Sequence, residues 1–240
     1  TEIYTLSLHD ALPIFLIEPE GLVADQIPRD VRLSIVDLVQ VSAFVARSKG
    51  WWDPYPGRLT CKLLFQSELS EAFEEFRKGR LETYYSETDH GPKPEGFFVE
   101  LADLGIRAAD TIGRLLATSS AAFAKHGLLA IDYGHELVSP DDDDFGEGEW
   151  GVSDAFSDER VGPVDEQDDR LLIAVERLDQ LIGEWWTASM TPARSIRGLA
   201  AIIDSVFSIG CGYGVDMHKL VIEKSRYNYK RSYRHGNKAC

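Results

Sequence analysis

The chain has 240 residues, 44% of them hydrophobic, which is enough for one large globular domain. Its formal net charge of −15 at pH 7 argues against general nucleic-acid binding, because a phosphate backbone would be repelled. A small phosphorylated substrate stays possible, since a metal ion can screen the local charge.

Cysteine content and hydropathy indicate a cytoplasmic protein. The three cysteines, Cys61, Cys211 and Cys240, lack the spacing of zinc ligands, so we expect reduced thiols. We find no apolar run of the roughly 18 residues that a membrane-spanning helix needs. We therefore expect neither a membrane nor a nucleic acid as a partner.

The first 14 residues, TEIYTLSLHDALPI, resemble the translation of a short-read sequencing adapter. We expect residues 1–14 to be an artefact and exclude them from the fold, as one would a cloning scar. The true start of the protein is then missing, and residues 15–240 are treated as a single domain.

Helical periodicity dominates the first half of the chain. Helices are predicted over residues 28–48, 59–78 and 96–116, and Gly79 ends the second of them. Between the second and third we predict a loop, because Asp, Gly and Pro are frequent there, and we find no convincing strand series. The expected apolar stripe of the second helix consists of Leu63, Leu64, Leu69, Ala72, Phe73 and Phe76.

The second half contains a long acidic segment and three further predicted helices. Residues 139–169 are rich in Asp and Glu and predict a solvated, partly disordered loop. Helices are predicted over residues 166–189, 192–209 and 216–229. The whole pattern predicts an all-α helical bundle with an insertion at about residues 117–195.

Two acidic pairs carry the most specific chemical signal. Glu68 and Glu71 are three residues apart on one predicted helix, and Glu100 and Asp103 have the same spacing on the next. Four carboxylates that converge across two packed helices repel one another unless a cation neutralises them. Their hard oxygen ligands suit Mg²⁺. The plain alternative is that all four are exposed helix charges.

Nearby residues add to this reading. Arg107 and Asp110 follow Asp103 on the same helical face, where Arg107 can pair with either Asp103 or Asp110. Glu74 and Glu75 are expected to be surface charges, or groups that support the ligands from behind.

The stretches KLLFQSELSEAFEEFRKGR and GPKPEGFFVELADLGIRAAD resemble the MazG-like branch of the all-α NTP pyrophosphatases. The signature of that family is E-x-x-E, a spacer, then E-x-x-D. The segments KGWWD and EKSRYNYKRSYRHGNK also resemble phage and bacterial members. The resemblance covers residues 28–112 and 210–238, whereas the insertion between them departs from the family.

The resemblance implies an enzyme that hydrolyses nucleoside triphosphates, deoxynucleoside triphosphates above all, to the monophosphate and pyrophosphate. It implies Mg²⁺, or Mn²⁺, bound by the two acidic pairs, with Glu68 and Glu71 catalytic and a homodimer or higher homo-oligomer as the assembly. The implied substrate-binding residues are Lys224, Asn228, Arg231, His235 and Trp52, with Arg107 and Asp110 in support.

Two features of the sequence bear on that implication. Lys224, Asn228 and Arg231 share a helical face, which by itself favours an anion-binding role. Trp51 or Trp52 would stack on a base or lie in the core. The alternatives are a non-catalytic helical module that binds metal and a partner, and a hydrolase of another pyrophosphate compound such as an alarmone.

Overall fold

The structure is a computed structural model that describes residues 33–54, 56–118, 166–187 and 192–234. Within these ranges six helices and one hairpin of two short strands make up the fold, which confirms the predicted all-α class. The elements are α2 (Ile35–Ser48), α3 (Arg58–Arg77), β1 (Tyr84–Thr88), β2 (Gly91–Glu95), α4 (Phe97–Thr118), α7 (Glu166–Thr187), α8 (Pro192–Gly212) and α9 (Met217–Lys230).

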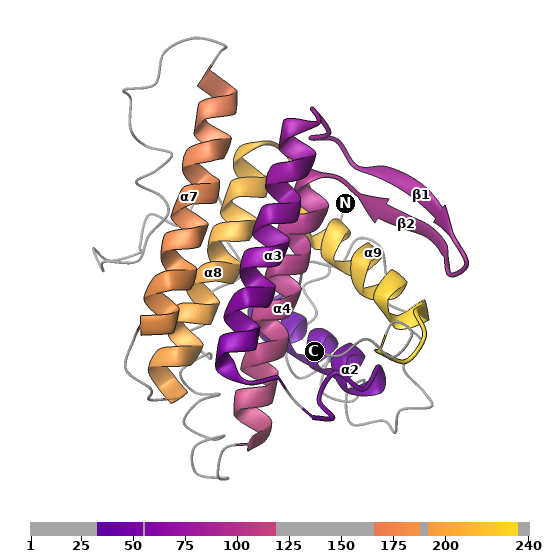
Figure 1. Ribbon diagram of the computed structural model, residues 1–240, viewed down its shortest axis with the longest axis vertical. Coiled ribbons are helices and arrows are strands. Elements are labelled where there is room, and N and C mark those ends of the chain that lie inside the picture. Colours follow the sequence, from indigo (N-terminus) through magenta and orange to yellow (C-terminus); the bar gives the residue numbers. More distant parts are fainter. Residues whose placement is uncertain (1–32, 55, 119–165, 188–191, 235–240) are drawn as a thin grey trace, which may run out of the picture.

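Four long helices form a bundle, and α4 joins it to the rest of the molecule. In Figure 1, α3, α4, α7 and α8 run along the long axis, with α2, α9 and the hairpin on one side. Both α3 and α8 contact α4 and α7, so the four helices close on one another. Because α4 also packs against α2 and α9, residues 97–102 at its start are all buried.

The first described helix begins later than the sequence pattern predicted. The Ser34 hydroxyl accepts a hydrogen bond from the amide of Asp37, and the Asp37 carboxylate accepts one from the amide of Ser34. This reciprocal capping box satisfies free donors at the start of a helix. It fixes the start of α2 at Ile35, so the predicted continuous helix over residues 28–48 was wrong at Leu33 and Ser34, while its first part lies outside the described residues.

A β-hairpin occupies the place where a loop was predicted. β1 and β2 pair antiparallel, with Tyr85 opposite Pro94 and Glu87 opposite Pro92. The two prolines are two residues apart, so their nitrogens face the same edge of the ladder. In a two-stranded sheet the outer edge needs no donor, which lets a strand carry prolines at alternate positions. The prolines had been read as loop residues, and that reading was wrong.

Gly96 joins the hairpin to α4 in a conformation that only glycine fits. Its φ is 125°, and a Cβ at this position would lie 2.6 Å from the backbone oxygen of Glu82. The carbonyl of Gly96 accepts a hydrogen bond from the amide of Glu100 at 3.1 Å. This turn therefore sets where α4 begins and where Glu100 lies.

The expected insertion contributes a core helix. Most of the acidic segment predicted as a solvated loop lies outside the described residues, as do residues 1–14. Its last part belongs to α7, which packs against α8 and α3. The buried side chains of α7 are Leu171, Ala174, Leu178, Leu181, Ile182 and Trp185.

Helix α8 contains an apolar run of the length that a membrane-spanning helix needs, which the sequence was not expected to contain. The segment Arg194–Gly212 of α8 is long and apolar enough to cross a membrane by length and composition alone. However, 56% of it is buried inside the molecule, where α8 packs against α4 and α7. A helix enclosed on several sides in a protein core has the same composition, and we assign α8 to the core.

Candidate metal centre

Two of the buried side chains on α3 are glutamates. The face of α3 turned to the core carries Cys61, Phe65, Glu68, Leu69, Ala72 and Glu75. Leu63 and Phe73 are 57% and 39% exposed, so their predicted place in the core was wrong. Apolar residues occur on two faces of this helix, and the face that packs is the one that includes the glutamates. Buried carboxylates need donors or cations nearby.

Three of the four predicted carboxylates come together between α3 and α4. One oxygen each of Glu68, Glu71 and Glu100 lies within 4.8 Å of the others, close enough to share a metal ion. Glu68 and Glu100 are buried, whereas Glu71 is exposed and accepts a hydrogen bond from the Ser67 hydroxyl at 3.1 Å. The cluster therefore has a buried floor and one ligand that faces solvent.

The fourth predicted ligand, Asp103, pairs with a lysine from α9. Its Oδ2 lies 2.9 Å from Nζ of Lys224, which also lies 3.9 Å from Oε1 of Glu100. Lys224 is only 2% exposed, and its ammonium group also donates a hydrogen bond to the carbonyl of Pro94 at 3.4 Å. The residue expected to bind a triphosphate is thus part of the carboxylate cluster.

Arg107 is the second cation of the cluster. Its Nε donates to Oε1 of Glu68, whereas the sequence suggested a pairing with Asp103 or Asp110. The four carboxylates therefore outnumber the two cations that form ion pairs with them, Arg107 and Lys224.

The electrostatics of the buried acids reflect this imbalance. Burial raises the pKa of Glu68 to about 7, although Arg107 acts against the shift. Burial likewise raises the pKa of Glu100 to about 8 against the attraction of Lys224. The loss of hydration therefore raises these two pKa values by more than the attraction of Arg107 and Lys224 lowers them. A divalent cation held by oxygen ligands favours the ionised acids, so the donor set fits Mg²⁺ or Mn²⁺.

Arg231 lies at the end of α9, seven residues after Lys224. The helix ends at Lys230, and Arg231 follows as its C-cap with a φ of −65°, which is still helical, so its side chain leaves the chain on the helical face of Lys224 and Asn228. Burial lowers the pKa of Arg231, while attraction to Asp103 and Glu68 opposes the shift. Arg231 is therefore on the side of α9 that faces the carboxylates. His235 lies outside the described residues.

Trp52 lies against α4 and not in the centre of the core. Its indole Nε1 donates to Oδ1 of Asp110 at 2.7 Å, and its ring lies 5.6 Å from the guanidinium of Arg47 and 5.9 Å from that of Arg114. Burial raises the pKa of Asp110 to about 7, whereas the Trp52 hydrogen bond lowers it. The hydrogen bond from Trp52 to Asp110 thus attaches the turn between α2 and α3 to helix α4.

Of the two roles expected for Glu75, a surface charge or a group that supports the ligands, the first was wrong. It is 8% exposed, and its two carboxylate oxygens accept hydrogen bonds from Lys78 Nζ and the Tyr84 hydroxyl, both at 2.9 Å. Burial alone would raise the pKa of Glu75, but these donors bring it below its ordinary value. The burial of Glu75 could have been predicted from its spacing, because it shares one helical face with Phe65, Glu68 and Ala72.

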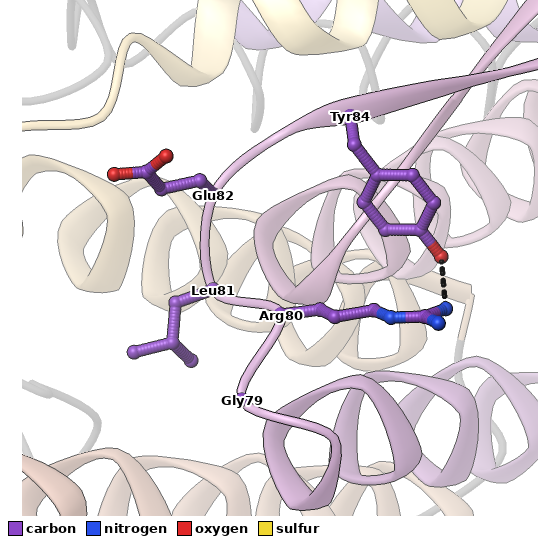
Figure 2. A pocket seen from close by; sticks show the side chains of 5 residues that line it. All are labelled: Gly79, Arg80, Leu81, Glu82 and Tyr84. Atoms are coloured by element: carbon purple, nitrogen blue, oxygen red, sulfur yellow. Dashed lines mark hydrogen bonds between the residues drawn. The ribbon is translucent and has the colours of Figure 1, made fainter.

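A hollow of about 570 Å³ lies beyond Glu75, at the end of α3. Figure 2 shows its lining, in which the Arg80 guanidinium reaches the hydroxyl of Tyr84 at 2.9 Å. None of the predicted ligands lines it. The lining residues are Gly79, Arg80, Leu81, Glu82 and Tyr84.

Comparisons with protein-family models, with curated proteins and with solved structures found no match for this chain.

Proposed function

We propose that the protein is a Mg²⁺-dependent nucleoside triphosphate pyrophosphohydrolase of the MazG-like type, active in the cytoplasm in clearing unwanted nucleotides. The observation that supports this most is the group of Glu68, Glu71 and Glu100, whose oxygens lie within 4.8 Å of one another. Lys224 and Arg231 place positive charge beside the same group. Acidic ligands beside cations suit a bound metal together with an anionic substrate.

The metal ligands in this proposal are Glu68, Glu71, Glu100 and Asp103. The first three are already close together. Asp103 is paired with Lys224, and in this proposal its carboxylate would contact both the lysine and the metal ion. Mg²⁺ bound there supplies Lewis-acid stabilisation of the charge on the phosphate oxygens.

The residues of the chain have separate tasks in the reaction. The oxygen of a water molecule attacks the α-phosphorus of the nucleotide, the bond from that phosphorus to the bridging oxygen breaks, and pyrophosphate leaves. Glu71 is the member of the catalytic pair that faces solvent, and it accepts the proton of the water. Glu68 is held by Arg107 and serves as a fixed ligand. Arg231 binds the phosphate chain.

A pyrophosphate-release assay across the common NTPs and dNTPs with Mg²⁺ tests the proposal. An alarmone and oxidised nucleotides are added to the panel to cover other pyrophosphate substrates. The Glu71→Gln variant should lose turnover by at least about a hundredfold, since one general base contributes that much. The control is Glu74→Gln, which removes only a surface ion pair with Arg77 and should keep full activity. Equal activity of wild type and Glu71→Gln would refute the site.

One observation favours a second candidate, a metal-binding module without catalysis. The ammonium group of Lys224 already neutralises Asp103, so this carboxylate does not need a metal ion as its partner. In that case calorimetry would detect Mg²⁺ binding, while no member of the nucleotide panel would be hydrolysed.

We also propose that two copies of the chain associate through the outer face of α3. Leu59, Leu63 and Phe73 are 55%, 57% and 39% exposed and share one face of this helix. Exposed apolar side chains that recur on one helix face favour association with a partner.

A further inference from the structure

Residues 231–234, which we call the docked segment, bind to the turn that ends α2. The amide of Arg234 donates to the carbonyl of Lys49 at 3.0 Å, and its Nε donates to the carbonyl of Gly50 at 3.1 Å. The ring of Tyr233 covers Gly50 so closely that a Cβ on that glycine would overlap the ring. Two segments that the sequence separates by 184 residues therefore form one unit.

Gly50 is required at this turn for two separate reasons. Its φ of 75° lies in the left-handed region, which side chains disfavour. Its amide donates to the carbonyl of Arg47 at 3.0 Å, and the amide of Trp51 donates to that of Ala46 at 2.9 Å, which completes a Schellman motif. The missing side chain also leaves the space that the Tyr233 ring occupies.

The turn is itself fixed to α4 and to α9. Trp52, two residues after Gly50, donates to Asp110 of α4 at 2.7 Å. On the other side, Lys49 Nζ lies 4.7 Å from the centre of the Tyr229 ring, which stacks on Phe44 with ring centres 5.8 Å apart. The docked segment is thus attached to a rigid part of the molecule.

Arg231 lies at the start of the docked segment, about two helical turns beyond Lys224, whose Nζ contacts Asp103 of the carboxylate cluster. Its amide donates to the carbonyl of Asn228 at 3.3 Å, and its guanidinium lies 5.9 Å from the Tyr227 ring. The end of α9 holds its backbone on one side, and the two hydrogen bonds of Arg234 to the turn hold the segment on the other. A long side chain whose backbone is already ordered loses less entropy when it binds a ligand.

We propose that Gly50 and Tyr233 are positioning residues, which dock residues 231–234 and so hold Arg231 at the edge of the carboxylate cluster to bind the phosphate chain of the substrate. The identity of this anion as a polyphosphate rests on the function proposed above. Neither residue touches the reacting atoms, so both act through Arg231.

Binding of inorganic tripolyphosphate in the presence of Mg²⁺, measured by calorimetry, tests the proposal. This ligand has no nucleobase, and the measurement does not depend on hydrolysis. Gly50→Ala and Tyr233→Ala should each weaken binding by about tenfold, the size expected for one misplaced charge-assisted hydrogen bond. Gly79→Ala is the matched control, because Gly79 has a φ of 68° with nothing within 4 Å of an added Cβ. It carries the same backbone strain without the ring contact, and its affinity should match that of the wild type.

Two further measurements separate positioning from general destabilisation. In an Arg231→Ala background, Gly50→Ala should weaken tripolyphosphate binding no further, because effects that act through one group are not additive. Hydrogen exchange should show a protected Arg234 amide in the wild type and a fast-exchanging one in Gly50→Ala, with unchanged helical circular dichroism.

The outcomes also separate this inference from the proposed function. If the wild type hydrolyses nucleotides and Gly50→Ala binds tripolyphosphate equally well, the positioning role is wrong and the function stands. A further loss of affinity in the Arg231→Ala background overturns the positioning role too, as does an unprotected Arg234 amide in the wild type. If the wild type neither binds tripolyphosphate nor hydrolyses any nucleotide, both proposals fail.

Discussion

The ammonium nitrogen of Lys224 lies 2.9 Å from Oδ2 of Asp103, where α9 crosses α4. Lys224 is almost completely buried, and its hydrogen-bond acceptor on the hairpin is the carbonyl of Pro94. A buried lysine is stable only with such partners, since desolvation disfavours its charged form. The pKa of Lys224 is nevertheless raised, because attraction to Asp103 and Glu100 outweighs the effect of burial.

The first prediction concerns this ion pair. Lys224→Met leaves Asp103 and Glu100 without their nearest cation, and breaking a buried pair in this way costs about 3 kcal/mol or more of unfolding free energy. Urea denaturation in EDTA measures the loss. Lys219→Met, at an exposed position of the same helix, is the control and should cost little. Equal stability of the two variants would contradict the importance of the pair.

The second prediction concerns pH. The pKa values of Glu68 and Glu100 rise from 4.5 to about 7 and about 8 on folding, so the native state retains protons that the unfolded chain has released. Their stabilising contribution is therefore full below pH 4.5 and is lost as the pH rises through 7 and 8. We expect the metal-free protein to lose stability across this range, and Mg²⁺ to restore it at the high end.

Urea denaturation at several pH values, in EDTA and in Mg²⁺, measures this dependence. Glu100→Gln is the control, because glutamine does not titrate, and the slope against pH should become shallower. A wild-type slope that Glu100→Gln leaves unchanged would mean that other groups control the pH dependence.

The helices were predictable because their signal is local. Periodicity identified α3, α4, α7, α8 and α9 within a few residues, since each repeats apolar positions at helical spacing. The start of α2 was missed although its signal is also local: Ser34 and Asp37 have the spacing of a capping box. The hairpin was missed because proline is normally counted against a strand, whereas here it occupies the free edge.

The candidate site was predictable in part. Glu68, Glu71 and Glu100 were found from their spacing on two helices, and these helices do pack together. The partner of Asp103 could not be found in this way, because the pair depends on how α9 crosses α4 after more than a hundred intervening residues. The docking of Arg234 on Gly50 depends on the same long-range packing.

The third prediction concerns the hydrogen bond between Trp52 and Asp110. Trp52→Phe removes the indole donor, so the ionised Asp110 carboxylate loses a partner, at a cost of about 1–3 kcal/mol. The folded pKa of Asp110 is about 7, above its ordinary 3.8, and loss of the donor raises it further. The cost should therefore be larger above pH 7 than near pH 5, where the carboxyl group is protonated. In an Asp110→Asn background the pH dependence of the cost should disappear, as denaturation at both pH values would show.

The fourth prediction concerns the outer face of α3. If Leu63 and Phe73 contact a second copy of the chain, sedimentation should show a dimer at about micromolar concentration. The Leu63→Glu variant should be a monomer, because burying a charge at an apolar contact is costly. Ile173→Glu, at an exposed apolar position of α7, is the control and should stay dimeric. A wild-type monomer would remove the assembly from the proposal while leaving the carboxylate cluster within each chain intact.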